Sequence, residues 1–471
     1  MTPAERNEDR SVAALLAPDI LVLLDDSPAD VAAETEEMHP ADLADVAEEM
    51  PRERVAEFLL ALPAERAADV LEYLDEELRT ELLEEMTAKQ AAVIVEQMTP
   101  DDRADTLEAL EEEVADDILA EIPAEARRET EQLLRYETDS AGGLMTTEFV
   151  SADEEVTVDQ ALERVRALAR SGRREAMYAV YTTDTAGRLR GVISLRELLA
   201  AAPGTKLGDA AWTEVVSVSP TADREEVARV TANYDLVAVP VVSESGHVMG
   251  VVTVDDVIDA IQEEQTEDVH KLGGMEALDE SYMQVGIGAM VKKRAGWLAI
   301  LFLGGLLTAT AIDYFQDELS RAVLLLAFIP LIISSGGNSG SQATSLIIRA
   351  MALNEISPGD WWRVALRELY SGLLLGSILG LLGVTRVVLW HLMGWSDYGD
   401  WYWRVGLTIG AALLGVVTFG SFVGAMLPFL LRRLGLDPAS ASAPFVATLV
   451  DVTGLVIYFT AAALLLRGTL L

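Results

Sequence analysis

The sequence predicts a multidomain membrane protein with an α-helical superhelix, an α/β module of two similar halves, and an all-α polytopic membrane domain of five spans. Three observations predict this fold class. Residues 39–134 repeat every 12 residues, residues 139–262 alternate short strands with helices twice over, and residues 291–471 contain five long apolar stretches. The expected parts are an N-terminal segment 1–38, a helical-repeat domain 39–138, a paired module 139–262, a connecting helix 263–290 and a membrane domain 291–471.

Negative charge is concentrated before the membrane domain. Residues 281–471 hold 10 of the 77 acidic residues and 12 of the 35 Lys and Arg residues, which leaves 67 acids and 23 bases in residues 1–280. This charge repels phosphates, so nucleic acid is excluded as a partner. The acids would either attract divalent cations or keep the surface hydrated at high salt, and composition leaves both readings open. Cysteine is absent, which excludes disulfides and thiolate metal sites.

The helical-repeat domain is predicted from eight contiguous 12-residue segments, which run from His39 to Leu134. Each segment ends in a large apolar residue, such as Met50, and positions eight and nine are also mostly apolar. This spacing marks one face of a short helix, and a stack of such helices buries each apolar stripe against its neighbours. Asp101 and Asp105 are four residues apart and therefore share a helix face. A solvated surface is the alternative to a cation site there.

The paired module repeats the order strand, turn, strand, helix. Strands at 179–181 and 191–194 precede a helix at 195–200, and the same order returns between 237 and 257. The matching residues of the two halves are Gly191 and Gly250, Ser194 and Thr253, and Glu197 and Asp256. Two copies of this element in register, each after a predicted strand, resemble a pair of CBS domains. The resemblance implies an adenine nucleotide such as ATP, with Ser194 and Thr253 near phosphate and Glu197 and Asp256 near ribose; a purely structural role is the alternative.

The connecting helix carries acids at helical spacing, from Asp259 through Glu263 and Glu264 to Glu267 and Asp268. It leads through Gly273-Gly274 to the first apolar stretch. Such a helix is placed to transmit movement from an acidic sensor to a pore, and a solvated linker is the alternative.

The membrane domain contains five stretches long enough to cross about 30 Å of hydrocarbon. The expected spans are 295–315, 322–348, 365–393, 404–431 and 443–466. Basic residues precede span one and lie in the loops between spans two and three and between spans four and five, whereas acids such as Asp313, Asp317, Glu318, Asp397 and Asp400 lie in the other loops. By the positive-inside rule the repeat domain and paired module are cytoplasmic and the C-terminus is outside. The N-terminal residues lack the features of a signal peptide.

Two features of the spans indicate a cation pathway. The polar, glycine-rich run Ser334–Gln342 lies inside the second span, where polar chain is expected only against protein or a water-filled path. Asp451 is the only acid in the fifth span, where an unpaired carboxylate costs at least a few kcal/mol.

The order of these parts, the Gly-Gly-Asn-x-Gly-x-Gln run in span two and the segment from Leu436 to Gly454 resemble the MgtE magnesium channel/transporter family. The resemblance covers the chain from about residue 20 onward. It implies a homodimer in the cell membrane whose pore holds hydrated Mg²⁺ at Asp451, with Gly337 and Asn338. It also implies closure by cytosolic Mg²⁺ at the acids Asp101, Asp105, Asp223, Glu225, Asp235, Asp256, Asp259, Glu264, Glu267 and Asp268. Two departures are Glu197, where ATP-binding members usually carry aspartate, and Ser334-Ser335, where glycine is common.

Two classes of function remain. The first is a Mg²⁺-selective, Mg²⁺-gated dimeric channel, and the second is a proton- or sodium-coupled divalent cation transporter that uses Asp451 as a relay. The five spans lack evident inverted repeats, which weakens the second class. No P-loop or other hydrolytic motif is present, so we expect neither ATP-driven pumping nor an enzyme.

Overall fold

The structure is a computed structural model that describes residues 3–170, 178–278, 282, 285–315 and 323–467. The chain forms two compact units, Met1–Glu263 and Glu264–Leu471. Asp317 and Glu318, which the sequence places in the loop after span one, lie outside the described residues.

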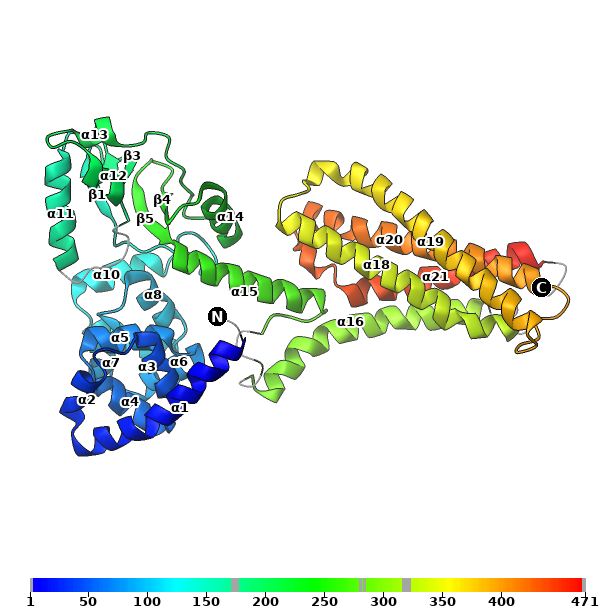
Figure 1. The fold of residues 1–471 in the computed structure, drawn as a ribbon, viewed down its shortest axis with the longest axis horizontal. Helices are drawn as coiled ribbons and strands as arrows, with labels where there is room; N and C mark the ends of the chain where they lie inside the picture. Colours follow the sequence, from blue (N-terminus) through cyan, green and yellow to red (C-terminus); the bar gives the residue numbers. More distant parts are fainter. Residues whose placement is uncertain (1–2, 171–177, 279–281, 283–284, 316–322, 468–471) are drawn as a thin grey trace. The chain divides into compact units, whose positions relative to one another are not determined.

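Each 12-residue segment of the repeat folds as one helix, as predicted (Figure 1). The helices are α3 (Pro40–Glu48), α4 (Arg52–Ala61), α5 (Ala64–Tyr73), α6 (Glu76–Glu85), α7 (Ala88–Val95), α8 (Pro100–Glu108), α9 (Glu112–Glu121) and α10 (Ala124–Leu133). Their apolar positions form one core that includes the fully buried Phe58, Leu71 and Leu83. The preceding helices α1 (Pro3–Asp26) and α2 (Pro28–Glu34) contribute Leu24 and Val31 to the same core.

The paired module contains two hairpins with the same register. The elements are β1 (Val150–Asp153), α11 (Val158–Arg170), β2 (Ala179–Thr183), β3 (Leu189–Ser194), α12 (Leu195–Ala200), α13 (Leu207–Ala210), α14 (Arg224–Tyr234), β4 (Ala238–Val242) and β5 (Val248–Thr253). Strand β1 pairs in parallel with β2, while β2–β3 and β4–β5 are antiparallel. Gly191 pairs with Thr182 as Gly250 pairs with Val241. A Cβ at either glycine would lie under 3 Å from a backbone carbonyl oxygen, of Trp212 and Thr146 respectively, so both positions need glycine.

Helix α15 (Val254–Leu272) is a single helix of 19 residues that begins in the first unit and ends in the second. It contains neither glycine nor proline, the residues at which helices kink or break. Its backbone hydrogen bonds therefore continue without interruption along the helix.

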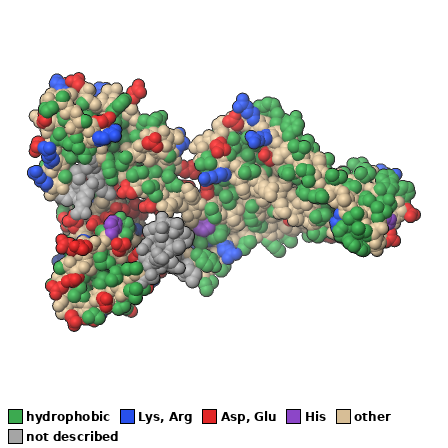
Figure 2. Space-filling view, viewed as in Figure 1, with side chains coloured by type: hydrophobic (Ala, Val, Ile, Leu, Met, Phe, Trp, Pro, Cys, Tyr) green, Lys and Arg blue, Asp and Glu red, His purple; other side chains and the backbone are tan. Residues whose placement is uncertain are grey.

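The second unit contains five helices long and apolar enough to cross a membrane, as the sequence predicts. They are α16 (Ile287–Tyr314), η1 (Val323–Phe328) with α18 (Ile329–Ala352), η2 (Pro358–Asp360) with α19 (Trp361–Leu392), α20 (Tyr402–Arg433), and α21 (Ala443–Leu466), the last preceded by η3 (Pro438–Ser440). Figure 2 shows apolar side chains over much of this unit and acidic side chains gathered on the helical repeat. The chain is thus a multi-pass membrane protein.

Glycines let the spans approach each other closely. A Cβ on Gly420 or Gly424 of α20 would overlap the carbonyl oxygen of Gly336 or Gly340 of α18. Thr344 donates to the carbonyl oxygen of Gly424 at 2.9 Å, and the Ser339 and Ser421 hydroxyls lie 2.6 Å apart. Part of the polar run in span two therefore serves helix packing, as in other membrane bundles with small interfacial residues.

Candidate functional site

The polar run of α18 has two faces. Gly336, Gly337 and Gly340 are buried, and Gly337 faces Ala447 of α21 within the same chain. The opposite face carries an exposed polar stripe at helical spacing, consisting of Ser334, Asn338, Gln342 and Ser345. The Asn338 amide donates to the Ser334 hydroxyl at 3.4 Å. Of the two predicted backbone contributors to the pore, Asn338 lies on the outward stripe and Gly337 lies in the packing contact.

Asp451 lies on α21, which packs against α18. Gly340 faces Val446 and Gly336 faces Val450, so α18 and α21 run antiparallel. Asp451, one residue beyond Val450, is therefore level with the turn of α18 that contains Ser334. Asp451 is half-buried, and no Lys, Arg or His among the described residues forms an ion pair with it. A carboxylate without a protein counter-ion in a span is a strong candidate for binding a mobile cation.

A second group of carboxylates lies within the first unit, where α8 faces the start of α15. We call it the acidic cluster; its members are Glu72, Asp101, Asp102, Asp105, Asp255, Asp256 and Asp259. Burial, with the charge of Asp102, raises the pKa of Asp101 to about 7 and that of Glu72 to about 8. Burial, with the charge of Asp101, raises the pKa of Asp105 to about 7 and that of Asp256 to about 8. These shifts mean that the fully ionised cluster repels itself and favours a bound cation or proton.

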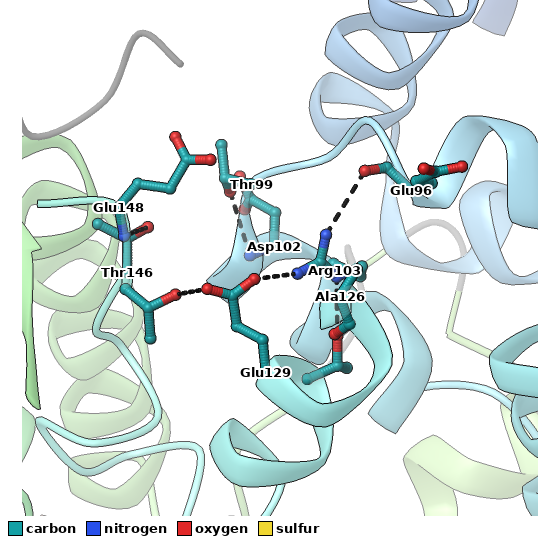
Figure 3. A network of polar contacts seen from close by, with 10 residues as sticks. Glu96, Thr99, Asp102, Arg103, Ala126, Glu129, Thr146 and Glu148 are labelled. Atoms are coloured by element: carbon teal, nitrogen blue, oxygen red, sulfur yellow. Dashed lines mark hydrogen bonds and ion pairs between the residues drawn. The ribbon is translucent and has the colours of Figure 1, made fainter. Parts of the chain in front are cut away.

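A buried arginine holds α8 in this position (Figure 3). Arg103 donates to the Thr130 hydroxyl at 2.7 Å and to the Glu129 carboxylate at 3.1 Å, both on α10. Glu129 in turn accepts a hydrogen bond from Thr147, in the segment that leads into the paired module. The network fixes the helix that carries Asp101, Asp102 and Asp105.

One oxygen of the acidic cluster is not satisfied by the described residues. Asp101 is only 4% exposed, and its Oδ1 atom has no hydrogen-bond partner among the described residues. A buried polar atom without a partner costs free energy, so such atoms are usually satisfied by water or an ion. No three His, Cys, Asp or Glu side chains in the described ranges form a group able to hold a metal on their own. A cation there would use few protein oxygens and keep much of its water.

The remaining predicted sensor residues of the paired module lie apart from the acidic cluster. Asp223 caps the start of α14 by accepting from the Glu225 backbone N–H at 2.8 Å. Asp235 ends the same helix in a left-handed conformation with φ 51°. Asp223 and Glu225 lie together at the start of α14 and Asp235 lies at its end, so the length of the helix keeps Asp235 away from the other two acids within this chain.

The C-terminal part of α15 brings further predicted acids next to the segment before span five. Burial, with the charges of Asp437 and Glu264, raises the pKa of Asp268 to about 6. The Lys271 ammonium lies 2.5 Å from Glu267 and 2.6 Å from Asp437. Asp437 also caps η3 by accepting from the Ala439 backbone N–H at 2.8 Å. Glu267, Asp268 and Asp437 thus gather around one lysine.

The candidate nucleotide residues are occupied by local caps. Ser194 and Glu197 form a capping box, and Glu197 also accepts from the Trp212 indole at 2.8 Å. These hydrogen bonds, that from Trp212 first, lower the pKa of Glu197. Thr253 donates to Asp256 in the same way at the start of α15. A ribose would have to displace or share these hydrogen bonds.

Four charged residues of these sites were not predicted: Glu72, Asp102, Asp255 and Lys271. Asp102 and Asp255 each adjoin a predicted acid in the sequence, and this was the available signal for them. Glu72 belongs to another repeat helix, and Lys271 contacts a residue 166 positions away. Only the fold therefore brings Glu72 to the acidic cluster and Lys271 to Asp437.

The fold and these sites define a multi-pass membrane protein with an acidic helical-repeat domain, a CBS pair and an unpaired carboxylate in a span. Family profiles match along the chain: "Divalent cation transporter" (MgtE) at residues 329–461, "MgtE intracellular N domain" at 38–139, and "CBS domain" at 141–204 and 207–263. The chain belongs to the MgtE family.

Curated relatives support this assignment. The magnesium transporter MgtE of Thermus thermophilus is 44% identical over 342 residues, which are 73% of each chain. That of Enterococcus faecalis is 35% identical over 345 residues, again 73% of each. A crystal structure of the soluble part of a magnesium transporter is 30% identical, with a TM-score of 0.50, and covers 54% of this chain and 99% of its own.

Proposed function

We propose that the chain is a Mg²⁺-selective channel that takes up magnesium as a homodimer and closes when cytosolic Mg²⁺ is high. Relatives named as magnesium transporters support the transported ion. The observation that carries the proposal is Asp451, a half-buried carboxylate in a membrane span without an ion pair among the described residues. We infer a channel because this carboxylate can bind a mobile cation within a span.

The exposed polar stripe of α18 supports a dimeric pore. Hydrocarbon does not satisfy the side chains of Ser334, Asn338 and Gln342, so this face is expected to contact water or protein rather than lipid. A second copy placed across a two-fold axis would enclose the stripe and bring two Asp451 carboxylates to one path. The lipid bilayer would then cover the apolar faces.

Magnesium suits such a site. Mg²⁺ loses water reluctantly and prefers octahedral oxygen, commonly from one or two carboxylates with several waters. Two Asp451 carboxylates, with backbone or amide oxygen near Gly337 and Asn338, would hold the hydrated ion without stripping it. Conduction needs such weak binding, because the ion must also leave.

Regulation is assigned to the acids of both units. The unpartnered Oδ1 of Asp101 and the raised pKa values of Asp105 and Asp256 fit an oxygen-only cation site. Bound Mg²⁺ would relieve the repulsion within the acidic cluster, and Glu264 and Asp268 would take a further ion on α15. The exposed acids Asp223, Glu225 and Asp235 would need a partner subunit to complete a site.

The proposed division of labour follows the predicted domains. Residues 39–138 and 139–262 form the sensor on the cytoplasmic side, 263–290 connect it to the pore, and 291–471 form the pore with the C-terminus outside. ATP binding at the CBS pair remains a prediction, because Ser194, Glu197, Thr253 and Asp256 already form caps. A Glu197→Asp variant that binds ATP more tightly in calorimetry would support it.

Flux into liposomes tests the pore assignment. Asp451→Ala should lower Mg²⁺ uptake by at least tenfold, which corresponds to about 1.4 kcal/mol, because it removes the carboxylate that would bind the ion within the span. Asp400→Ala, which removes an exposed loop carboxylate, should leave uptake unchanged. Wild-type flux in Asp451→Ala, with an intact dimer by size-exclusion chromatography, would refute the assignment.

The same assay separates the alternative of a proton- or sodium-coupled transporter. A channel conducts Mg²⁺ down its own gradient regardless of the other ions, whereas a coupled transporter needs a pH or sodium gradient. Uptake that requires either gradient would replace the channel by the transporter.

A further inference from the structure

Lys271 lies among the acids at the end of α15, next to Asp268, to which the proposed regulation gives a metal ion. Its ammonium lies 2.5 Å from Glu267, one turn earlier on α15, and 2.6 Å from Asp437, in the segment before span five. Glu264 and Asp268 lie close enough to affect the same group of charges. The bridge therefore joins two elements of the second unit through a cation that the chain itself supplies.

Both ends of this bridge are anchored to membrane helices. Beyond Lys271, the Lys293 ammonium at the start of α16 donates to the Ala277 carbonyl at 2.7 Å, and the Leu278 backbone N–H donates to His270 Nδ1 at 3.3 Å. On the other side, Ser442 caps α21 and accepts from the Trp297 indole of α16 at 3.0 Å. A positive-φ glycine, Gly274, fits against Trp297, where a Cβ would lie 2.6 Å from the indole nitrogen. The end of α15 is thus seated on the helices that lead into spans one and five.

Solvent ions can reach the bridge. A cavity of about 420 Å³ is lined by Glu267, Lys271, Glu276, Trp297 and Ser440, all in the second unit. Hydrated cations therefore have access to Glu267, one of the two carboxylates that Lys271 holds. Its side chain and a metal ion compete for the same oxygens.

We propose that Lys271 is a resident cation that locks the end of α15 to Asp437 without Mg²⁺ and competes with Mg²⁺ for Glu267 and Asp437. This inference rests on the proposed function for its effect on gating, but the lock itself does not. An ammonium carries three donors and one charge, and it cannot share these oxygens with an octahedral, hydrated ion at the same point. Mg²⁺ must displace Lys271 or bind beside it at Glu264 and Asp268.

Lys271 and Mg²⁺ would therefore each contribute part of the free energy that stabilises the closed arrangement. With Lys271 present, the end of α15 stays partly docked on Asp437 at low Mg²⁺. Without it, Glu267, Asp268 and Asp437 repel one another until Mg²⁺ enters, so docking depends more steeply on the ion.

The test uses the full-length protein in nanodiscs with limited proteolysis of the segment 273–278 at low and high Mg²⁺. Lys271→Met should speed cleavage about fivefold or more at low Mg²⁺, the lower range of a typical coupling, and high Mg²⁺ should restore protection. Lys292→Met, which removes an exposed lysine without a described ion pair, is the matched control and should cleave like the wild type. The double variant Lys271→Glu with Asp437→Lys exchanges the two charges. It should restore the protection that each single variant loses.

Flux measured in parallel separates the two proposals. If Lys271→Met is cleaved like the wild type at low Mg²⁺, or if the charge exchange restores nothing, the lock is wrong. If cleavage responds as expected but wild-type flux is insensitive to Mg²⁺, the lock stands and the proposed Mg²⁺ gating fails. If both respond, Lys271→Met should show higher flux than the wild type at low Mg²⁺.

Discussion

Single carboxylates in this chain have different chemical tasks because their surroundings differ. Asp101 is buried with an oxygen that has no partner among the described residues, Asp437 holds a lysine and caps a turn, and Asp451 is half-buried in a span with no ion pair to a described residue. Each was visible in the sequence as an acid. Only burial and neighbours distinguish the proposed sensor residue from the cap and from the proposed pore ligand.

Asp101 gives the clearest test at this scale. Its pKa is raised from 3.8 to about 7 by burial and by Asp102, so the folded state holds the proton over a pH range where the unfolded state has lost it. Stability therefore falls as pH rises from about 4 to about 7 and stays low above that range. Asp101→Asn cannot ionise, so at pH 8.5 without Mg²⁺ it should raise the Tm of residues 1–271 by about 2–4 °C, or about 1 kcal/mol.

The control for this variant is Asp116→Asn, an exposed acid on α9. At pH 5 the stabilisation by Asp101→Asn should shrink, because the wild-type carboxyl is then protonated in the folded state. Differential scanning calorimetry at both pH values checks the sign. An equal gain from both variants at pH 8.5 would attribute the effect to net charge alone.

At the scale of the element, the helix contacts explain which glycines matter. A Cβ on Gly424 would overlap the carbonyl oxygen of Gly340, whereas one on Gly305 of α16 meets nothing within 4 Å in this chain. Gly424→Ala should therefore push α20 from α18 and lower the Tm of the full-length protein by several degrees, the typical result of overpacking by about 1–3 kcal/mol.

Gly305→Ala is the matched control, since it makes the same change in a span without the close approach. It should leave Tm unchanged or raise it, because alanine favours the helix more than glycine does. Thermal aggregation assays in detergent distinguish the two. A drop with Gly305→Ala equal to that with Gly424→Ala would mean that α16 packs against a partner there.

Elements were the part of the structure that the sequence predicted best. All eight repeat helices, both hairpins of the CBS pair and the five spans follow from apolar spacing, which is a local property. The sites depended on distant contacts. Asp101 and Asp256 come together across two helices, one of which Arg103 ties to α10, and Asp235 is kept from Asp223 by the length of α14. Neither the contact between Lys271 and Asp437 nor the approach of Glu72 to the acidic cluster left a local signal.

At the scale of the whole molecule, the acidic charge has a measurable consequence. Mg²⁺ should make residues 1–271 more compact and more resistant to protease, because an ion that binds the folded, closed arrangement shifts the population toward it. Small-angle scattering with MgCl₂ and with KCl at matched ionic strength gives the comparison, since screening acts over about 8–10 Å for both salts. Equal compaction by both would assign the acidity to salt adaptation.

The unbroken backbone of α15 also fixes an angle. Each residue of an α-helix turns the chain by about 100° and advances it by 1.5 Å. Within the second unit, the seven-residue step from Glu264 to Lys271 therefore sets the azimuth of one side chain relative to the other, with no glycine or proline to absorb a twist. Inserting one alanine midway would turn the lysine by about 100° away from its partners, whereas inserting four would bring it to within about 40° of its former direction. In this part of the helix a change in register is also a rotation, so Glu264, Glu267 and the Lys271 ammonium cannot be turned independently of one another.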